Sequence, residues 1–214
     1  MKTMYLFRTR LNQLNKNQLY ILFQTTRVLN TIRFFNKQMS DKYKHRFENE
    51  FNKKEFLEYV FYHCSIIWEI MDLIYKNLYK RLIGEIDENI LAEVKTLYNE
   101  IKSGKINEII ILKEIRNKHS FHIAFDPQYA DSFFTDELAR YDLPIGLVGS
   151  NFEKDMFFNF EDRILIAYLE RKFKMEPEEI FDLMMSSLEK YSHCIHELFK
   201  KIFKDITKNS IYMI

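Results

Sequence analysis

The chain contains little glycine, proline or cysteine. Four glycines, three prolines and two cysteines occur among 214 residues. A disulfide-stabilised secreted domain needs more cysteines, so Cys64 and Cys194 are predicted to be reduced thiols of a cytoplasmic protein. Apolar runs long enough to span a bilayer are lacking, and the apolar start of the chain is too short for a signal peptide. We therefore expect no membrane association.

An excess of charge of one sign is lacking as well. The chain has 32 Lys and Arg against 31 Asp and Glu, which gives a formal net charge of +1. This balance argues against a broad electrostatic clamp on nucleic acid, whereas a local phosphate site needs only one or two cations. Hydrophobic residues, in contrast, make up 47% of the chain. Such a chain can bury a sizeable core, and we predict a single domain over residues 1–214.

The few glycines and prolines fall where helical periodicity stops. Between them, apolar residues recur at three- and four-residue spacing, and alternating strand patterns are absent. The predicted helices cover approximately residues 3–39 (with a break near 12–17), 52–82, 87–103, 107–124, 160–172 and 177–208. The irregular stretch of about 126–159 is predicted to be a long connection, a kind of segment that is often functional. These features predict an all-α, up-and-down helical bundle with extra terminal helices.

Polar residues interrupt the apolar helix predicted over residues 107–124. Near its end the helix carries Arg116, Asn117, His119 and His122. At about 100° per residue, Arg116, His119 and His122 step round an arc of roughly 120°. A guanidinium and an imidazole that face a shared interior surface need partners, and a phosphate would satisfy both.

This combination of residues suits metal-independent RNA cleavage. The reaction needs a base to take the proton of the ribose 2′-hydroxyl, and a cation to stabilise charge on the scissile phosphate. His122 suits the first task because histidine titrates near neutral pH. Arg116 suits the second because its guanidinium is planar and always charged. Asn117 can orient either group, and neither a metal nor a cofactor is needed.

The segment Ile115–His122, followed by Asp126 and Pro127, resembles the motif of the HEPN superfamily. In that motif an arginine and a polar residue are followed, four to six residues later, by a histidine. The local sequence is similar to HEPN proteins of phage abortive infection and toxin–antitoxin loci. The resemblance covers the motif-bearing bundle of about 52–127, with weaker support over 158–169.

The resemblance implies a HEPN-like helical bundle that forms a homodimer, with one composite ribonuclease site where two motifs meet. RNA would be the substrate, and a cognate antitoxin protein would be a partner. Arg116 would stabilise the phosphate, His122 would be the general base or acid, and Asn117 would orient them. His119 has no fixed counterpart in the family, so it either assists or only packs.

The chain departs from one HEPN pattern. Some HEPN toxins carry a tyrosine two residues after the histidine, which a partner nucleotidyltransferase modifies. This position is Ala124 here, and the nearest downstream tyrosine is Tyr129. Control by that route is therefore not expected. Many HEPN proteins are non-catalytic, so the alternative function is a dimerisation module that binds a nucleotide or a partner protein.

Purely structural interpretations stand beside the catalytic one. Arg116 and His122 would also be satisfied in the interior by carboxylates such as Glu69 or Asp72. The pairs His63-Cys64 and His193/His196 would suit a metal only weakly, because neither CxxC nor HExxH accompanies them.

The basic and aromatic stretch Arg27–Lys44 also has two interpretations. It is compatible with RNA contact, but Asp41 and Glu48 dilute its charge. An ordinary solvent-exposed face is therefore the favoured interpretation.

Overall fold

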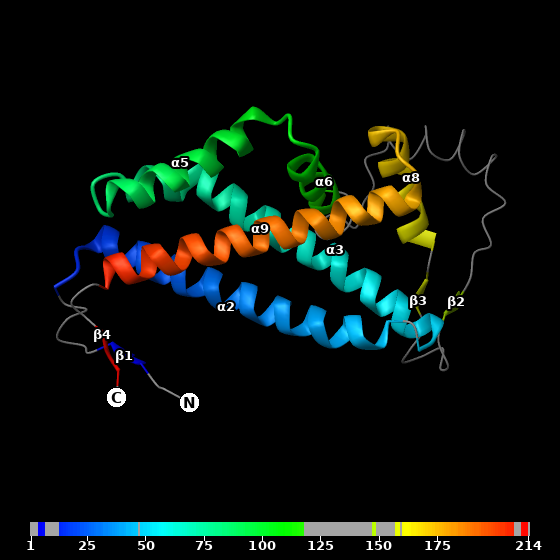
Figure 1. Cartoon of the computed structure of the whole chain (residues 1–214), viewed down its shortest axis with the longest axis horizontal. Coiled ribbons are helices and arrows are strands. Elements are labelled where there is room, and N and C mark those ends of the chain that lie inside the picture. Colours follow the sequence, from blue (N-terminus) through cyan, green and yellow to red (C-terminus); the bar gives the residue numbers. More distant parts are fainter. Residues whose placement is uncertain are drawn as a thin grey trace. The chain divides into compact units, whose positions relative to one another are not determined.

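Helices dominate the computed structural model, which describes residues 4–6, 13–46, 48–117, 147–148, 157–158, 160–207 and 211–213 (Figure 1). The helices are α2 (Lys16–His45), α3 (Glu50–Leu73), α4 (Tyr79–Leu82), α5 (Glu88–Ser103), α6 (Asn107–Ile115), α8 (Phe160–Phe173) and α9 (Pro177–Ile206). A π-helical segment, η1 (Ile74–Leu78), joins α3 to α4. Across these described ranges, every helix is too short or too polar to cross a membrane. The all-helical class is confirmed, while the up-and-down HEPN-like order stays a prediction.

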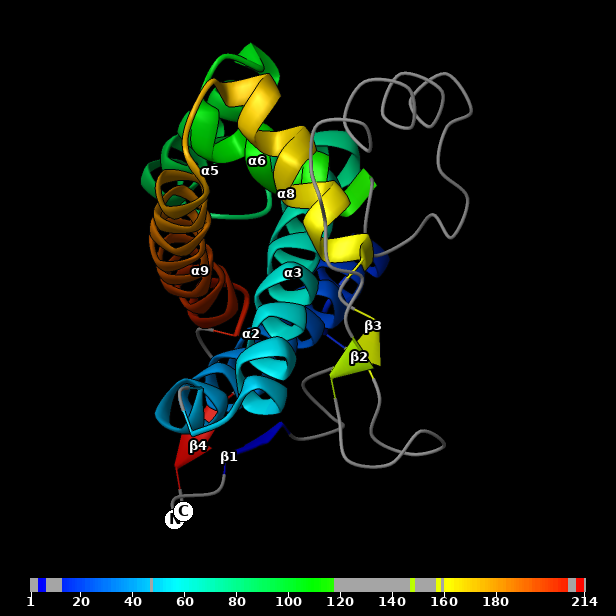
Figure 2. The same cartoon turned by 90° about the vertical axis from the view of Figure 1, so that its right-hand side faces the viewer.

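Two short antiparallel strand pairs accompany the helices. β1 (Met4–Leu6) pairs with β4 (Ile211–Met213), near the two ends of the chain in Figure 1. β2 (Leu147–Val148) pairs with β3 (Phe157–Phe158), as Figure 2 shows. The sequence did not predict these pairs, because strands of two or three residues are too short to show alternation. The first helix begins at Lys16, so the predicted break marks its start and not its interior.

The chain divides into two compact units. The first comprises Met1–Phe35, Glu69–Lys105 and Glu189–Ile214, and the second comprises Asn36–Trp68 and Ile106–Leu188. Helices α2, α3 and α9 contribute residues to both units. The single domain predicted over residues 1–214 stays a prediction.

In the first unit, α5 follows the sequence signals at both of its ends. The Asp87 side chain accepts a hydrogen bond of 2.9 Å from the Asn89 N–H and caps the N-terminus. Gly104 ends the helix in the left-handed conformation, with φ of +59°, which glycine adopts without a steric penalty. The helix buries Val94, Leu97 and Ile101, which follow one another at three- and four-residue spacing.

The apolar stripe predicted along residues 52–82 is buried throughout. Its members are Phe56, Val60, Cys64, Ile67, Met71, Ile74 and Leu78, each at most 4% exposed. The wide π turn of η1 was not predicted. The π-helical segment has a wider turn than an α-helix, yet Ile74 and Leu78 both remain 0% exposed.

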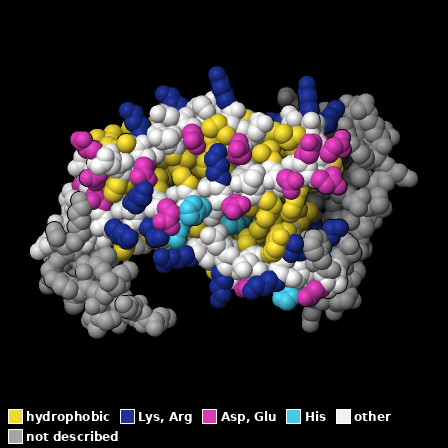
Figure 3. All heavy atoms as spheres, viewed as in Figure 1, with side chains coloured by type: hydrophobic (Ala, Val, Ile, Leu, Met, Phe, Trp, Pro, Cys, Tyr) yellow, Lys and Arg dark blue, Asp and Glu magenta, His cyan; other side chains and the backbone are white. Residues whose placement is uncertain are grey.

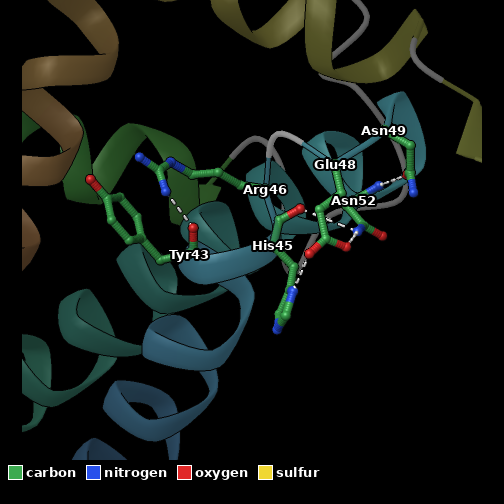
Figure 4. A network of polar contacts seen from close by, with 6 residues as sticks. All are labelled: Tyr43, His45, Arg46, Glu48, Asn49 and Asn52. Atoms are coloured by element: carbon green, nitrogen blue, oxygen red, sulfur yellow. Dashed lines mark hydrogen bonds and ion pairs between the residues drawn. The ribbon is translucent and has the colours of Figure 1, made fainter.

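In the second unit, a network of polar contacts closes the turn between α2 and α3 (Figure 4). The Asn49 side chain accepts a 2.8 Å hydrogen bond from the Asn52 N–H. The Asn52 amide in turn donates to the His45 carbonyl and to Glu48, each at 3.2 Å. The Arg46 guanidinium donates to the Tyr43 carbonyl. These bonds satisfy backbone groups at the end of one helix and the start of the next.

The connection between α8 and α9 is also formed by contacts between residues that are close in the sequence. Lys174 ends α8 with φ of +56°, a left-handed conformation that is unusual for a residue other than glycine. The Met175 N–H donates to the Glu170 carbonyl at 3.3 Å, which closes the helix end. Pro177 then begins α9, as predicted, with Glu178 and Glu179 in the first turn.

Candidate functional site

Arg116 lies directly after α6, at the C-terminal cap of that helix. The helix buries Ile109, Ile111, Leu112 and Ile115. Arg116 follows Ile109 by seven residues and Leu112 by four, so at helical spacing it continues the buried side of the helix. Its side chain is only partly exposed. A permanently charged guanidinium is thus held at the C-terminal end of the apolar helix α6. Residues 118–124 of the helix predicted over 107–124 lie outside the described residues.

Asn117 is the immediate polar neighbour of Arg116. The Arg116 Nη1 donates a hydrogen bond of 3.2 Å to the Asn117 Oδ1. Both residues are wound as a π-helix, and the Arg116 N–H donates to the Leu112 and Lys113 carbonyls. Single π turns within helices occur frequently at functional sites. The Asn117 amide therefore contacts the guanidinium directly. The orienting role expected of Asn117 in catalysis stays a prediction.

Glu114 anchors this end of α6 to α8, and the two helices lie side by side (Figure 2). The Tyr168 hydroxyl donates to Glu114 Oε2, and the Lys172 Nζ lies 2.7 Å from Glu114 Oε1. The Glu114 side chain is only 13% exposed, which strengthens both interactions. Sequence reasoning missed these three residues. The signal available was a carboxylate two residues before Arg116 in a predominantly apolar helix.

A cation–π contact lies on the neighbouring turn of α6. The Lys113 Nζ lies 5.9 Å from the centre of the Trp68 ring, on the part of α3 that belongs to the second unit. Together with Glu114, this contact ties the residues before Arg116 to two other helices. The backbone that presents Arg116 and Asn117 is therefore restrained before the π turn begins.

The remaining predicted site residues, His119 and His122, lie outside the described residues, as do Ala124 and Tyr129. The same holds for most of the 126–159 connection. Asp72, one of the carboxylates considered as a structural partner, pairs with Lys76 of its own helix at 2.7 Å. The catalytic and the structural interpretations of Arg116 both stay predictions.

The second histidine group divides between the two units. His63 and Cys64 belong to the second unit and are 3% and 0% exposed. Burial lowers the pKa of His63 to about 4 and raises the pKa of the Cys64 thiol. In the first unit, burial and the Lys200 ammonium lower the pKa of His196. Among the residues that the structure places, groups of three or more potential metal ligands are absent.

Charge is mixed on the molecular face of Figure 3. Dark-blue Lys and Arg side chains alternate with magenta Asp and Glu side chains, and hydrophobic side chains are exposed between them. This mixture agrees with the net charge of +1. A phosphate site on such a face depends on individual cations and not on a continuous positive field.

Comparison with known proteins gives no relative for this chain. No protein-family model, no curated protein and no solved structure matches it. Any functional interpretation therefore rests on the residues themselves and on the geometry around Arg116.

Proposed function

We propose that the protein is a HEPN-type, metal-independent endoribonuclease that acts in phage defence or in a toxin–antitoxin system. The observation that carries this proposal is the placement of Arg116. It follows a buried helix that is anchored through Glu114, and its guanidinium is hydrogen-bonded to Asn117. An oriented, always-charged group of this kind stabilises charge that develops on a phosphate.

The proposed reaction uses this cation together with a histidine base. His122 takes the proton of the ribose 2′-hydroxyl, and the 2′-oxygen attacks the adjacent phosphorus. Arg116 stabilises the negative charge that builds on the phosphate oxygens. The 5′-oxygen leaves with a proton, which gives a 2′,3′-cyclic phosphate and a 5′-hydroxyl end. In a homodimer, two copies of the motif would form one composite site.

Purified protein incubated with single-stranded RNA in EDTA tests the proposal. We expect cleavage by the wild type, and a decrease of about 100-fold or more for Arg116→Ala and for His122→Ala. Arg171→Ala, which removes an exposed arginine of α8, is the matched control and should cleave like the wild type. Equal cleavage by all variants, or none by the wild type, would refute the proposal.

The alternative function has a distinct outcome in the same experiment. A non-catalytic dimerisation or nucleotide-binding module would bind a nucleotide or a partner protein without any cleavage of RNA. In that case Arg116→Ala would change the affinity for the nucleotide, while RNA incubated with the wild type would stay intact.

A further inference from the structure

One side of α2 carries exposed aromatic and basic residues in a single row. Leu19, Phe23, Arg27, Asn30 and Phe34 are separated by four, four, three and four residues, so they lie along one side of the helix. We name this row the aromatic–basic face of α2. All five residues belong to the first unit.

Two phenylalanine side chains of this face are unusually exposed to solvent. Phe23 is 62% exposed and Phe34 is 56% exposed, although phenylalanine is usually buried. The opposite side of the helix supplies the core through Ile21, Leu22, Thr25, Val28, Leu29 and Ile32. The exposed phenylalanines are thus additional to the residues that anchor α2.

The charge of the same stretch has one sign. Residues 16–35 include Lys16, Arg27 and Arg33 and contain neither Asp nor Glu. The acidic residues that dilute the longer basic stretch in the sequence, Asp41 and Glu48, both come after it. Within the part of the chain that the structure describes, Arg27 forms neither an ion pair nor a hydrogen bond. Its guanidinium is available to an anionic ligand.

Single-stranded nucleic acid is the ligand that matches both features. Exposed aromatic rings provide stacking surfaces for unpaired bases, and neighbouring cations bind the phosphates that link them. Phe23 and Phe34 are eleven residues apart, or about 16 Å along the helix, with Arg27 between them. A duplex hides its bases from such rings, and a purely apolar protein partner would leave the Arg27 charge unused.

We propose that the aromatic–basic face of α2 binds single-stranded RNA, with bases stacked on Phe23 and Phe34 and a phosphate bound by Arg27. This inference rests on the proposed function for the choice of RNA as the ligand. It assigns substrate binding to a surface in the first unit, while Arg116 belongs to the second.

Binding is measured separately from cleavage by placing every variant in an Arg116→Ala/His122→Ala background. The probe is a fluorescein-labelled, unstructured RNA of about twelve nucleotides, and its anisotropy is recorded in EDTA. The matched duplex RNA is the second probe. Circular dichroism verifies that each variant keeps the helical content of the parent.

We expect Phe23→Ala and Phe34→Ala each to weaken single-strand binding about fivefold or more, the effect of one lost base stack. Arg27→Gln should decrease the slope of log affinity against log salt by about 0.7. Ile83→Ala removes an apolar side chain that is 56% exposed elsewhere in the first unit, and it should leave the affinity unchanged. Lys95→Gln, on the exposed side of α5, is the charge control.

Four outcomes would overturn this inference. The first two are equal affinity of all variants for RNA and equal binding of single-stranded and duplex RNA. The third is that no RNA binds at all. The fourth is that Phe23→Ala/Phe34→Ala converts a dimer to a monomer while the RNA affinity is unchanged. The last result would assign the face to a second copy of the chain. The proposed function fails independently, if RNA binds through this face but the intact protein does not cleave it.

Discussion

At the scale of single residues, His63 shows how burial is linked to stability. Its side chain lies in the core of the second unit, where desolvation lowers its pKa to about 4 from an ordinary value of 6.5. The folded protein therefore keeps His63 neutral at pH values at which the unfolded chain already binds a proton. Stability from this residue is complete above pH 6.5, and it decreases as the pH falls toward 4.

Replacement of His63 should remove this pH dependence. Between pH 7 and pH 4 the wild type should lose up to about 3 kcal/mol more unfolding free energy than His63→Gln. Urea denaturation at one-unit pH intervals measures the difference. The exposed His45→Gln serves as the control, and parallel pH profiles for the wild type and His63→Gln would show that this linkage is absent.

Lys174 is a second single residue whose replacement should change the free energy of unfolding. Its left-handed backbone, with φ of +56°, is disfavoured for a side chain with a Cβ atom. Lys174→Gly should raise the unfolding free energy by about 1 kcal/mol, because the strain relieved exceeds the added freedom of the unfolded chain. Lys95→Gly, inside α5, should lower it by about 1 kcal/mol. Loss of stability in Lys174→Gly would contradict the assigned cap geometry.

At the scale of elements, the interaction of α6 with α8 depends on one carboxylate. Glu114 accepts a hydrogen bond from Tyr168 and pairs with Lys172. Glu114→Ala should lower the unfolding free energy by about 2 kcal/mol, because it removes the part-buried carboxylate that accepts from the Tyr168 hydroxyl and pairs with Lys172.

A solvent-exposed pair provides the comparison for Glu114. Glu93 and Lys201 are 2.6 Å apart, with side chains that are 49% and 47% exposed. Glu93→Ala should cost less than about 1 kcal/mol, because water screens such a pair. Thermal unfolding of both variants measures the contrast. Equal losses would mean that the contact between α6 and α8 does not depend on Glu114.

The elements that could be predicted from the sequence are those with local signals. Asp87 and Gly104 determined the ends of α5, and Pro177 marked the start of α9. The π turn at Ile74–Leu78 and the short strands could not be predicted, because neither carries a local sequence signal such as a cap residue, a proline or a sustained alternating pattern. The same reason applies to the contact of Glu114 with Tyr168.

The candidate site was predictable to a similar extent. Helical periodicity placed Arg116 and Asn117 on the last part of a buried helix predicted over 107–124, and in the structure both residues directly follow α6 as a π turn. Periodicity also indicated that His119 and His122 follow on the same arc, and that prediction lies outside the described residues. The row of exposed residues on α2 was not singled out, because the window Arg27–Lys44 covers only part of the aromatic–basic face and includes Asp41 farther along the chain.

At the scale of the whole molecule, the proposed ribonuclease requires two chains. In the proposed mechanism, a composite site forms where two motifs meet, so we expect the active species to be a homodimer. Sedimentation equilibrium should give about twice the chain mass of 26.2 kDa. A monomer that retains full RNA cleavage at nanomolar concentration would show that one motif is sufficient.

The chemistry of the RNA ends tests the central claim most directly. The proposed attack by the 2′-oxygen leaves a 2′,3′-cyclic phosphate and a 5′-hydroxyl, and needs no metal. The wild type in EDTA should therefore give these ends, at a rate at least about 100-fold above that of Arg116→Ala. Products with 3′-hydroxyl and 5′-phosphate ends, loss of cleavage in EDTA, or an unchanged rate in Arg116→Ala would contradict the account.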